Sequence, residues 1–277
     1  MSTATVMGDA ELRRLAGEVI APGTTAPLGV YLLRGSDPAS ELARHVERVV
    51  FMETFGNTPE LLTKEYAPYD EASIFLCVVD HLRLVPAGTM RIVLPSEAGF
   101  KTLDDAAPVW GEPVSAMADR TGIELDLGRT WDIATLAVAP EYRGKATVGL
   151  VSMGLYQALA LATPRCGIEW LLAILDVPVF RMIRWKLRMP MAGFKGVTAQ
   201  PYLGSPASMP VWCNVGDTER RLAASDPDLH ALYFRGVGLE AALKPLDLRS
   251  TIGLEAKPRR VTRPSLGGRS RSASRAS

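Results

Sequence analysis

The sequence has few of the residues that carry metal or redox chemistry. Among 277 residues there are three cysteines and three histidines, and aromatic residues make up 7%. Cys77, Cys166 and Cys213 lie in separate apolar segments, without CxxC spacing or a neighbouring histidine. This pattern gives no support to a zinc site and predicts buried free thiols, as in a reducing cytoplasm.

Long hydrophobic runs and the common nucleotide-binding loops are absent as well. The longest apolar runs contain Arg, Lys or Pro within about 18 residues, so we expect no transmembrane span. The first residues lack the basic-then-apolar order of a signal peptide, and we expect a cytoplasmic protein. Neither GxxxxGK[ST] nor GxGxxG occurs, so any phosphate-bearing ligand must be bound by another motif.

Charge is distributed unevenly along the chain. Residues 256–277 hold seven Lys and Arg and no acid, which leaves 24 basic and 30 acidic residues in 1–255. The last segment is rich in Pro, Gly, Ser and Arg, and this composition predicts a disordered basic tail over 251–277. Because the rest of the chain is acidic and no aromatics interleave the tail, nucleic-acid binding is not favoured. A solubilising role, or contact with an acidic carrier protein, fits better.

The most informative segment spans residues 131–163. A short apolar strand is followed by a basic turn at Arg143, Gly144 and Lys145, and then by a helix with almost no charge. Backbone N–H groups at a helix N-terminus, the positive end of the helix dipole and two cationic side chains converge there. The pattern fits a phosphate-binding turn, and an ordinary strand–loop–helix remains an equal alternative.

Residues 136–150, LAVAPEYRGKATVGL, resemble motif A of the GNAT N-acyltransferase superfamily. The resemblance implies an acyl-CoA or acyl-carrier-protein phosphopantetheine donor, with no tightly bound cofactor. The family's two small positions fall on Ala146 and Val148, and the branched Val148 hinders close approach of backbone to a pyrophosphate. We therefore expect a preference for acyl-carrier protein. The implied donor-binding residues are Leu136, Ala137, Val138, Arg143, Gly144, Lys145, Ala146, Thr147 and Val148.

The order of predicted elements extends this resemblance to a whole domain. Strands, helices and turns alternate as β-α-α-β-β-β-α-β-α-β-β over residues 28–215, as in the GNAT fold. We expect an α/β (α+β) single domain with a mixed, mostly antiparallel central sheet flanked by helices. Residues 1–27 form an N-terminal extension and 216–250 a helical extension. Residues 95–129 are expected to be irregular, with a short helix at 114–119, and 193–199 and 209–215 to be strands.

Two further segments resemble one branch of the superfamily. Residues 65–70, EYAPYD, are similar to the E-x-D-x-[YF]-D stretch of acyl-homoserine-lactone synthases, and residues 132–136 are similar to their E-x-S-R-F strand. Arg91 falls where that family has a strand arginine. The middle acid is Ala67 here and a Trp expected after Phe51 is missing, which favours the related long-chain N-acyl amino acid synthases. The resemblance implies that Arg91, Glu65 and Tyr69 bind the substrate.

The chemistry of such a site requires a group that takes a proton from the attacking amine. Carboxylates are suited to this role, and the candidates are Asp132, Asp70 and Glu53, in that order. Many GNAT enzymes have a tyrosine acid in the helix after the fifth strand, but residues 177–187 contain no tyrosine. Two hypotheses stay open. The protein transfers an acyl group to a small amine such as an amino acid, or it is a non-catalytic acyl-thioester-binding or sensor protein.

Overall fold

The computed structural model describes residues 7–143 and 149–256. A nine-stranded sheet runs through these residues in the order β6-β8-β5-β4-β3-β2-β1-β9, with β7 paired to β8. Most neighbouring strands are antiparallel, so the mixed, mostly antiparallel sheet expected from the sequence is confirmed. The strands are β1 Leu28–Arg34, β2 Ser73–Asp80, β3 Val85–Val93, β4 Thr130–Val138, β5 Trp170–Asp176, β6 Ala192–Gly193, β7 Gln200–Tyr202, β8 Ser205–Asn214 and β9 Leu243–Lys244.

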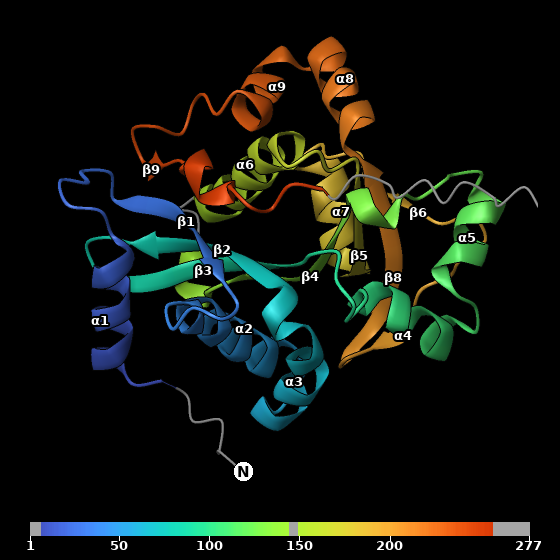
Figure 1. Ribbon diagram of the computed structural model, residues 1–277, viewed down its shortest axis with the longest axis horizontal. Helices are drawn as coiled ribbons and strands as arrows, with labels where there is room; N and C mark the ends of the chain where they lie inside the picture. Colours follow the sequence, from blue (N-terminus) through green and yellow to red (C-terminus); the bar gives the residue numbers. More distant parts are fainter. Residues whose placement is uncertain (1–6, 144–148, 257–277) are drawn as a thin grey trace, which may run out of the picture.

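Helices cover both faces of this sheet (Figure 1). In that view α1, α2 and α3 lie below the sheet, while α6, α8 and α9 lie above it. None of the helices in the described ranges is long and apolar enough to cross a membrane. The helices are α1 Asp9–Val19, α2 Ser40–Phe55, α3 Pro59–Tyr66, α4 Lys101–Trp110, α5 Val114–Thr121, α6 Leu150–Arg165, α7 Val177–Trp185, α8 Val215–Ser225 and α9 Pro227–Phe234.

Strand β2 explains why both faces of the sheet are covered. All eight of its residues are buried. Because successive side chains of a strand point to opposite faces, Phe75 and Cys77 pack with α1 and α2, while Leu76 and Val78 join the larger core that includes α6. An apolar run of this kind is stable only when a helix lies on each side. The three cysteines are free and buried, as the sequence predicts.

The parallel pair β4–β5 opens partway along its length. The two strands are paired from Thr130–Trp170 to Ile133–Ala173. Both continue beyond that point but no longer pair with each other. On its other side β4 stays paired with β3, but the register shifts at Ala134, where β4 carries a bulge. Bulges bend a strand and are frequent beside active sites. The divergence of β4 and β5 therefore creates a cleft at the C-terminal half of β4.

Two expectations about secondary structure were wrong, and the ordered part of the chain extends past its expected end. Residues 95–129 hold two helices. The short helix expected at 114–119 lies within α5, whereas α4 was missed because Pro108 and the turn-forming Asp104 and Asp105 obscure its helical pattern. The segment expected as a strand at 193–199 contains only the end of β6, and the chain re-enters the sheet at β7. Residues 251–256, assigned to the tail, are ordered, because Leu254 is buried and the Ala256 N–H donates to the Cys166 carbonyl at 2.7 Å. Residues 257–277 lie outside the described residues.

Candidate functional site

Two cavities meet where β4 bulges. One, which we call the polar cavity, has a volume of about 330 Å³ and lies between α2, α3 and strands β3 and β4. The other, the cleft, has a volume of about 80 Å³ and lies between the diverging ends of β4 and β5. Phe51, Tyr66 and Thr135 line both. The other residues of the polar cavity are Glu41, Arg44, Glu47, Arg48, Leu62, Thr63, Ala67, Asp70 and Arg91.

A buried ion pair forms the wall of the polar cavity nearest the sheet. The Arg91 Nε and Nη2 groups donate to Glu47 Oε1 and Oε2 at 3.0 and 2.8 Å, and Nη1 donates to Asp70 Oδ1 at 2.8 Å. The Thr135 hydroxyl also donates to Glu47. Burial disfavours the charged guanidinium, but Glu47 and Asp70 outweigh that effect and hold the pKa of Arg91 above its usual range. Arg91 is thus placed where the resemblance predicted a binding residue.

Glu47 is the central site residue that the sequence analysis missed. It lies on α2 between Ala43 and Val50, at helical spacing on the buried face of the helix, and only 4% of it is exposed. An acid in an apolar helical stripe is rarely buried without a partner. That spacing was the available signal, but the partner, Arg91, is 44 residues further along the chain.

The three predicted carboxylates lie in different environments. Asp70 lines the polar cavity, and 39% of its side chain is exposed. Glu53 is exposed on α2 and lines neither the polar cavity nor the cleft. Asp132 is fully buried and accepts the Thr102 N–H at 2.9 Å and the Thr102 hydroxyl at 2.6 Å. Burial raises the pKa of Asp132 to about 6, and the two hydrogen bonds from Thr102 oppose that rise.

Glu65 and Tyr69, predicted to bind the substrate, both contact α4. Glu65 accepts a hydrogen bond from Lys101 Nζ at 2.7 Å, and the Tyr69 hydroxyl donates to Asp104 at 2.6 Å. Burial is the largest cause that raises the pKa of Tyr69, followed by its bond to Asp104. Neither residue lines the polar cavity or the cleft. These two hydrogen bonds attach α4 to the end of α3 and to the segment that joins α3 to β2.

Tyr66 lines both the polar cavity and the cleft. Its ring lies under the Arg91 guanidinium, 4.7 Å from the ring centroid, and near Lys101 Nζ at 5.2 Å. Burial raises the pKa of Tyr66, so its hydroxyl stays protonated at neutral pH. A second tyrosine, Tyr202, lines the cleft and donates its hydroxyl to Asp105. The phenols at this site come from α3 and β7, whereas α7 contains none.

The predicted donor-binding strand reaches the cleft through Leu136, which lines it. Ala137 is buried and pairs with Thr89 of β3. The Val138 carbonyl accepts a hydrogen bond from Arg143 Nε at 2.7 Å, so the exposed Arg143 side chain turns back toward β4. Gly144, Lys145, Ala146, Thr147 and Val148 lie outside the described residues, and the phosphate-binding role of this turn stays a prediction.

An enclosed apolar cavity adjoins the cleft across the sheet. Its volume is about 30 Å³, and it shares Ile133, Leu136 and Leu175 with the cleft. The remaining lining residues are apolar apart from one tyrosine and one thiol: Met90, Tyr156, Leu159, Leu171, Ala173, Ile183, Met189, Met191 and Cys213. Flexible methionine side chains can rearrange to admit a ligand. The apolar cavity thus lies behind the wall of the cleft that these shared side chains form.

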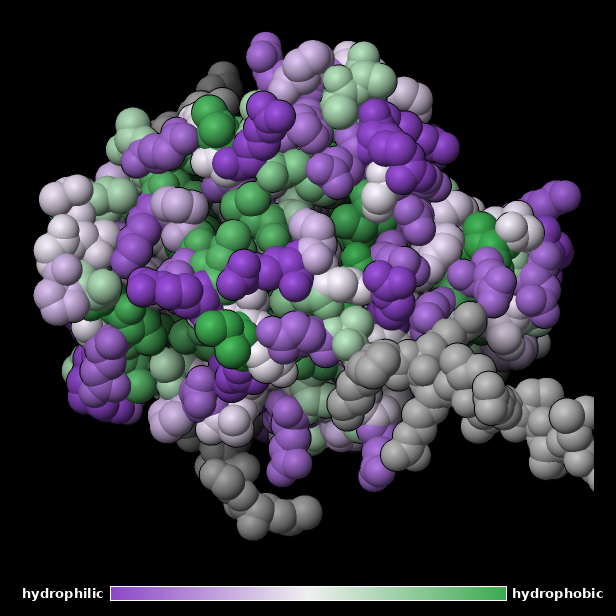
Figure 2. Space-filling model, turned by 45° about the horizontal axis from the view of Figure 1, so that its top comes forward, coloured by the Kyte–Doolittle hydropathy of each residue, from purple (hydrophilic) through white to green (hydrophobic). Residues whose placement is uncertain are grey.

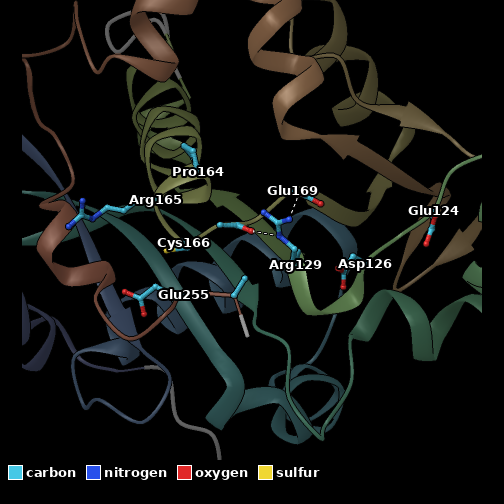
Figure 3. A pocket seen from close by; sticks show the side chains of 10 residues that line it. Glu124, Asp126, Arg129, Pro164, Arg165, Cys166, Glu169 and Glu255 are labelled. Atoms are coloured by element: carbon cyan, nitrogen blue, oxygen red, sulfur yellow. Dashed lines mark hydrogen bonds and ion pairs between the residues drawn. The ribbon is translucent and has the colours of Figure 1, made fainter. Parts of the chain in front are cut away.

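Another hollow, with a volume of about 740 Å³, lies at the opposite ends of β4 and β5 (Figure 3). There Arg129 donates to the Gly167 carbonyl at 3.0 Å and pairs with Glu169 at 2.5 Å. On the face seen in Figure 2, apolar areas are interrupted by hydrophilic side chains. No group of three or more potential metal ligands occurs in residues 7–143 and 149–256. The site at the bulge combines buried charge with adjoining cavities.

Comparison with family models and with curated proteins finds no match. Many solved structures are similar to this chain, and two with TM-scores above 0.5 are synthases. A CoA-dependent acyl-homoserine lactone synthase, BjaI, with SAM and isopentyl-CoA, is 14% identical with a TM-score of 0.51, over 79% of this chain and 92% of that chain. FeeM, an N-acyl amino acid synthase from uncultured soil microbes, is 13% identical with a TM-score of 0.51, over 72% and 99%. The GNAT-like fold predicted from the sequence is therefore confirmed.

Proposed function

We propose that this protein is an N-acyltransferase that moves an acyl group from an acyl-CoA or acyl-carrier-protein thioester to a small amine such as an amino acid. The observation that carries this proposal is the meeting of the polar cavity and the cleft at the bulge of β4. A polar amine and an apolar acyl chain need separate spaces that share one point, where the two substrates react. The names of the two structural neighbours, both acyl-transferring synthases, agree with it.

In this proposal each substrate occupies a cavity of its own. The acyl chain lies in the cleft and extends past Leu136 into the apolar cavity, which also lies next to Met189 and Met191. The amine lies in the polar cavity. Its nitrogen attacks the thioester carbon, a C–N bond forms, the C–S bond breaks and the thiol leaves. Asp70 is the predicted carboxylate that faces the polar cavity, so it accepts the amine proton directly or through water.

Tyr66 supports the same arrangement from the wall between the two cavities. A protonated phenol at that wall can donate a hydrogen bond to the oxyanion that forms on the thioester oxygen. The expected preference for a carrier-protein donor depends on Val148, which lies outside the described residues, so both donor classes belong in the test.

The test is to incubate the full chain with medium- and long-chain acyl-CoA, or with the same chains on carrier protein, and a mixture of amino acids. We expect free thiol to be released and a new mass to appear, equal to that of the free fatty acid plus the amine less one water. A Leu136→Trp variant, which fills the cleft, should lose this product. Leu127→Trp is the matched control, because Leu127 is 44% exposed and remote from the cleft.

The alternative is a non-catalytic protein that binds acyl thioesters. The absence of tyrosine from α7, Val177–Trp185, is the observation that favours it. Saturable binding of an acyl thioester without any acylated product, for either donor class and every amine, would establish the alternative and reject the transferase.

A further inference from the structure

One arginine of the polar cavity keeps unused hydrogen-bonding capacity. Arg48 Nη2 donates to Glu41 Oε2 at 2.8 Å, and this is its one hydrogen bond in the part of the chain that the structure describes. Only 13% of the Arg48 side chain is exposed. Its Nε is buried and has no hydrogen-bond partner among these residues. Leaving a buried charged donor unpaired is costly, so such an atom marks a place where a ligand can contribute.

Each of the other two arginines of the cavity has more partners than Arg48. Arg91 uses Nε and both Nη groups on Glu47 and Asp70. Arg44 donates to the Gly35 carbonyl at 2.9 Å and pairs with Asp70 at 3.2 Å and with Glu41 at 3.2 Å. Each carboxylate of the cavity is in turn paired with at least one arginine. The acids of the cavity are therefore neutralised, and Arg48 is its arginine with the fewest partners in the described part of the chain.

The unpartnered Nε of Arg48 indicates the chemistry of the ligand. A guanidinium presents adjacent N–H groups in one plane, which match the two oxygens of a carboxylate. Three acids and three arginines line the same cavity and balance one another in charge, so the unpartnered Nε of Arg48 suits a monoanion better than a dianionic phosphate. Because Arg48 shares this cavity with Thr135 and Tyr66, a small molecule held by its carboxylate can place another group at the bulge of β4.

We propose that the acceptor amine also carries a carboxylate, and that Arg48 binds this carboxylate and selects for it. The inference rests on the proposed N-acyltransferase function and adds the residue that sets the acceptor class. Arg48 acts on binding, so it leaves the chemistry of the thioester unchanged. Its removal raises KM for the acceptor and leaves kcat nearly constant, as expected for a contact made equally in the ground and transition states.

The experiment compares each amino acid with its carboxamide, which keeps the amine and side chain but has no negative charge. The unmodified protein should have a kcat/KM about ten- to a hundredfold higher for the amino acid, the effect of one charge-assisted hydrogen-bonded pair. In Arg48→Gln this ratio should fall to about one, with little change in KM for the donor. Arg48→Lys, which keeps the charge and loses the planar edge, should lie between the two.

If Arg48 had only a structural role, its replacement would lower kcat/KM for the amino acid and for the carboxamide together. The ratio of the two would then stay unchanged, which distinguishes this role from the proposed one. Arg14→Ala is the matched control, because Arg14 is an exposed, ion-paired arginine on α1 that does not line the cavity. Equal rates with amino acids and carboxamides in the unmodified protein would overturn this inference and leave the transferase intact. Failure to acylate any amine would instead reject the proposed function.

Discussion

At the scale of single residues, two buried carboxylates are stabilised in different ways. Glu47 is held by a bidentate pair with Arg91 and by the Thr135 hydroxyl. Asp132 has no cation bonded to it among residues 7–143 and 149–256, and it accepts two hydrogen bonds from Thr102 at the first turn of α4. There the helix dipole and free N–H groups favour a negative charge. Asp132 thus fixes the position of α4 on β4.

The raised pKa of Asp132 makes stability depend on pH. The folded pKa is about 6, above the ordinary value of 3.8, so between these values the folded state binds a proton that the unfolded state releases. The free energy of unfolding should therefore fall as the pH rises from about 4 to about 6. Asparagine does not ionise, so Asp132→Asn removes this dependence on pH. The free energy of unfolding of the variant, relative to the unmodified protein, should therefore rise over that range by up to about 3 kcal/mol.

Denaturant unfolding at several pH values measures this difference. Glu53→Gln is the control, because Glu53 is exposed, and its stability difference should stay flat. A flat profile for Asp132→Asn would show that the burial of this carboxyl does not affect its ionisation.

The Arg91–Glu47 pair leads to a second prediction at this scale. Arg91→Met leaves Glu47 buried beside Thr135 without its cation, which should cost about 3–5 kcal/mol of folding free energy. Combining it with Glu47→Gln should recover part of the loss, because the unpaired charge is gone. Thermal and denaturant unfolding would show this. Arg14→Ala, which breaks an exposed pair, should change stability by less than about 1 kcal/mol. A similar small effect for Arg91→Met would contradict the role assigned to the pair.

At the scale of elements, α6 lies unusually close to the sheet because β3 carries a glycine beneath it. A Cβ added at Gly88 would lie 2.5 Å from Val151 Cγ1 and 3.2 Å from the Ala137 carbonyl oxygen. Val151 is itself fully buried. Neither neighbour can move aside easily, since one is a stiff β-branched side chain and the other is backbone. The approach of α6 to β3 and β4 therefore depends on Gly88.

Gly88→Ala should accordingly destabilise the fold by about 1–3 kcal/mol, the usual cost of overpacking a core. Gly17→Ala is the matched control. Gly17 lies inside α1, a Cβ there meets nothing within 4 Å, and alanine is the better helix former, so stability should rise by about 0.5–1 kcal/mol. Thermal unfolding of both variants gives the comparison. An unchanged midpoint for Gly88→Ala would mean that α6 can shift without cost.

At the scale of the whole molecule, the C-terminal part of the described chain returns to the sheet. Strand β9 pairs in parallel with β1, and the Ile252 carbonyl accepts a hydrogen bond from Arg34 Nη2 at 3.0 Å. Thr251 and Leu254 are buried, and Ala256 pairs with Cys166 through the backbone. These contacts tie the end of the described chain to its first strand and to the end of α6.

Truncation at two points should therefore have different effects. Removal of residues 257–277 should leave the thermal midpoint nearly unchanged, because their composition offers little apolar surface to offset the entropy of ordering. Removal of residues 251–277 also deletes the buried Leu254 and should lower the midpoint by several degrees, or about 2 kcal/mol. Equal midpoints for the two truncated proteins would show that residues 251–256 contribute nothing to folding.

The sequence by itself determined the longer strands, the helix α6 and the fold class. An apolar run such as Ile74–Val79 or the uncharged stretch after Leu150 must be buried wherever it lies, and turn residues such as Gly56 end a helix locally. Arg91 could also be named in advance, because it lies in a strand whose pattern resembles a known family. These signals are local, and they need no knowledge of which segments meet.

The tertiary structure decided how the site is assembled. Glu47 and Arg91 meet across 44 residues, and Asp132 bonds to Thr102, 30 residues before it, in the first turn of α4. The cleft exists because β4 and β5 stop pairing after Ile133, a property of two strands together. Whether a charged residue faces a cavity, a partner or solvent depends on contacts between distant segments. Their free energy includes the entropy of closing long loops, which no local pattern contains.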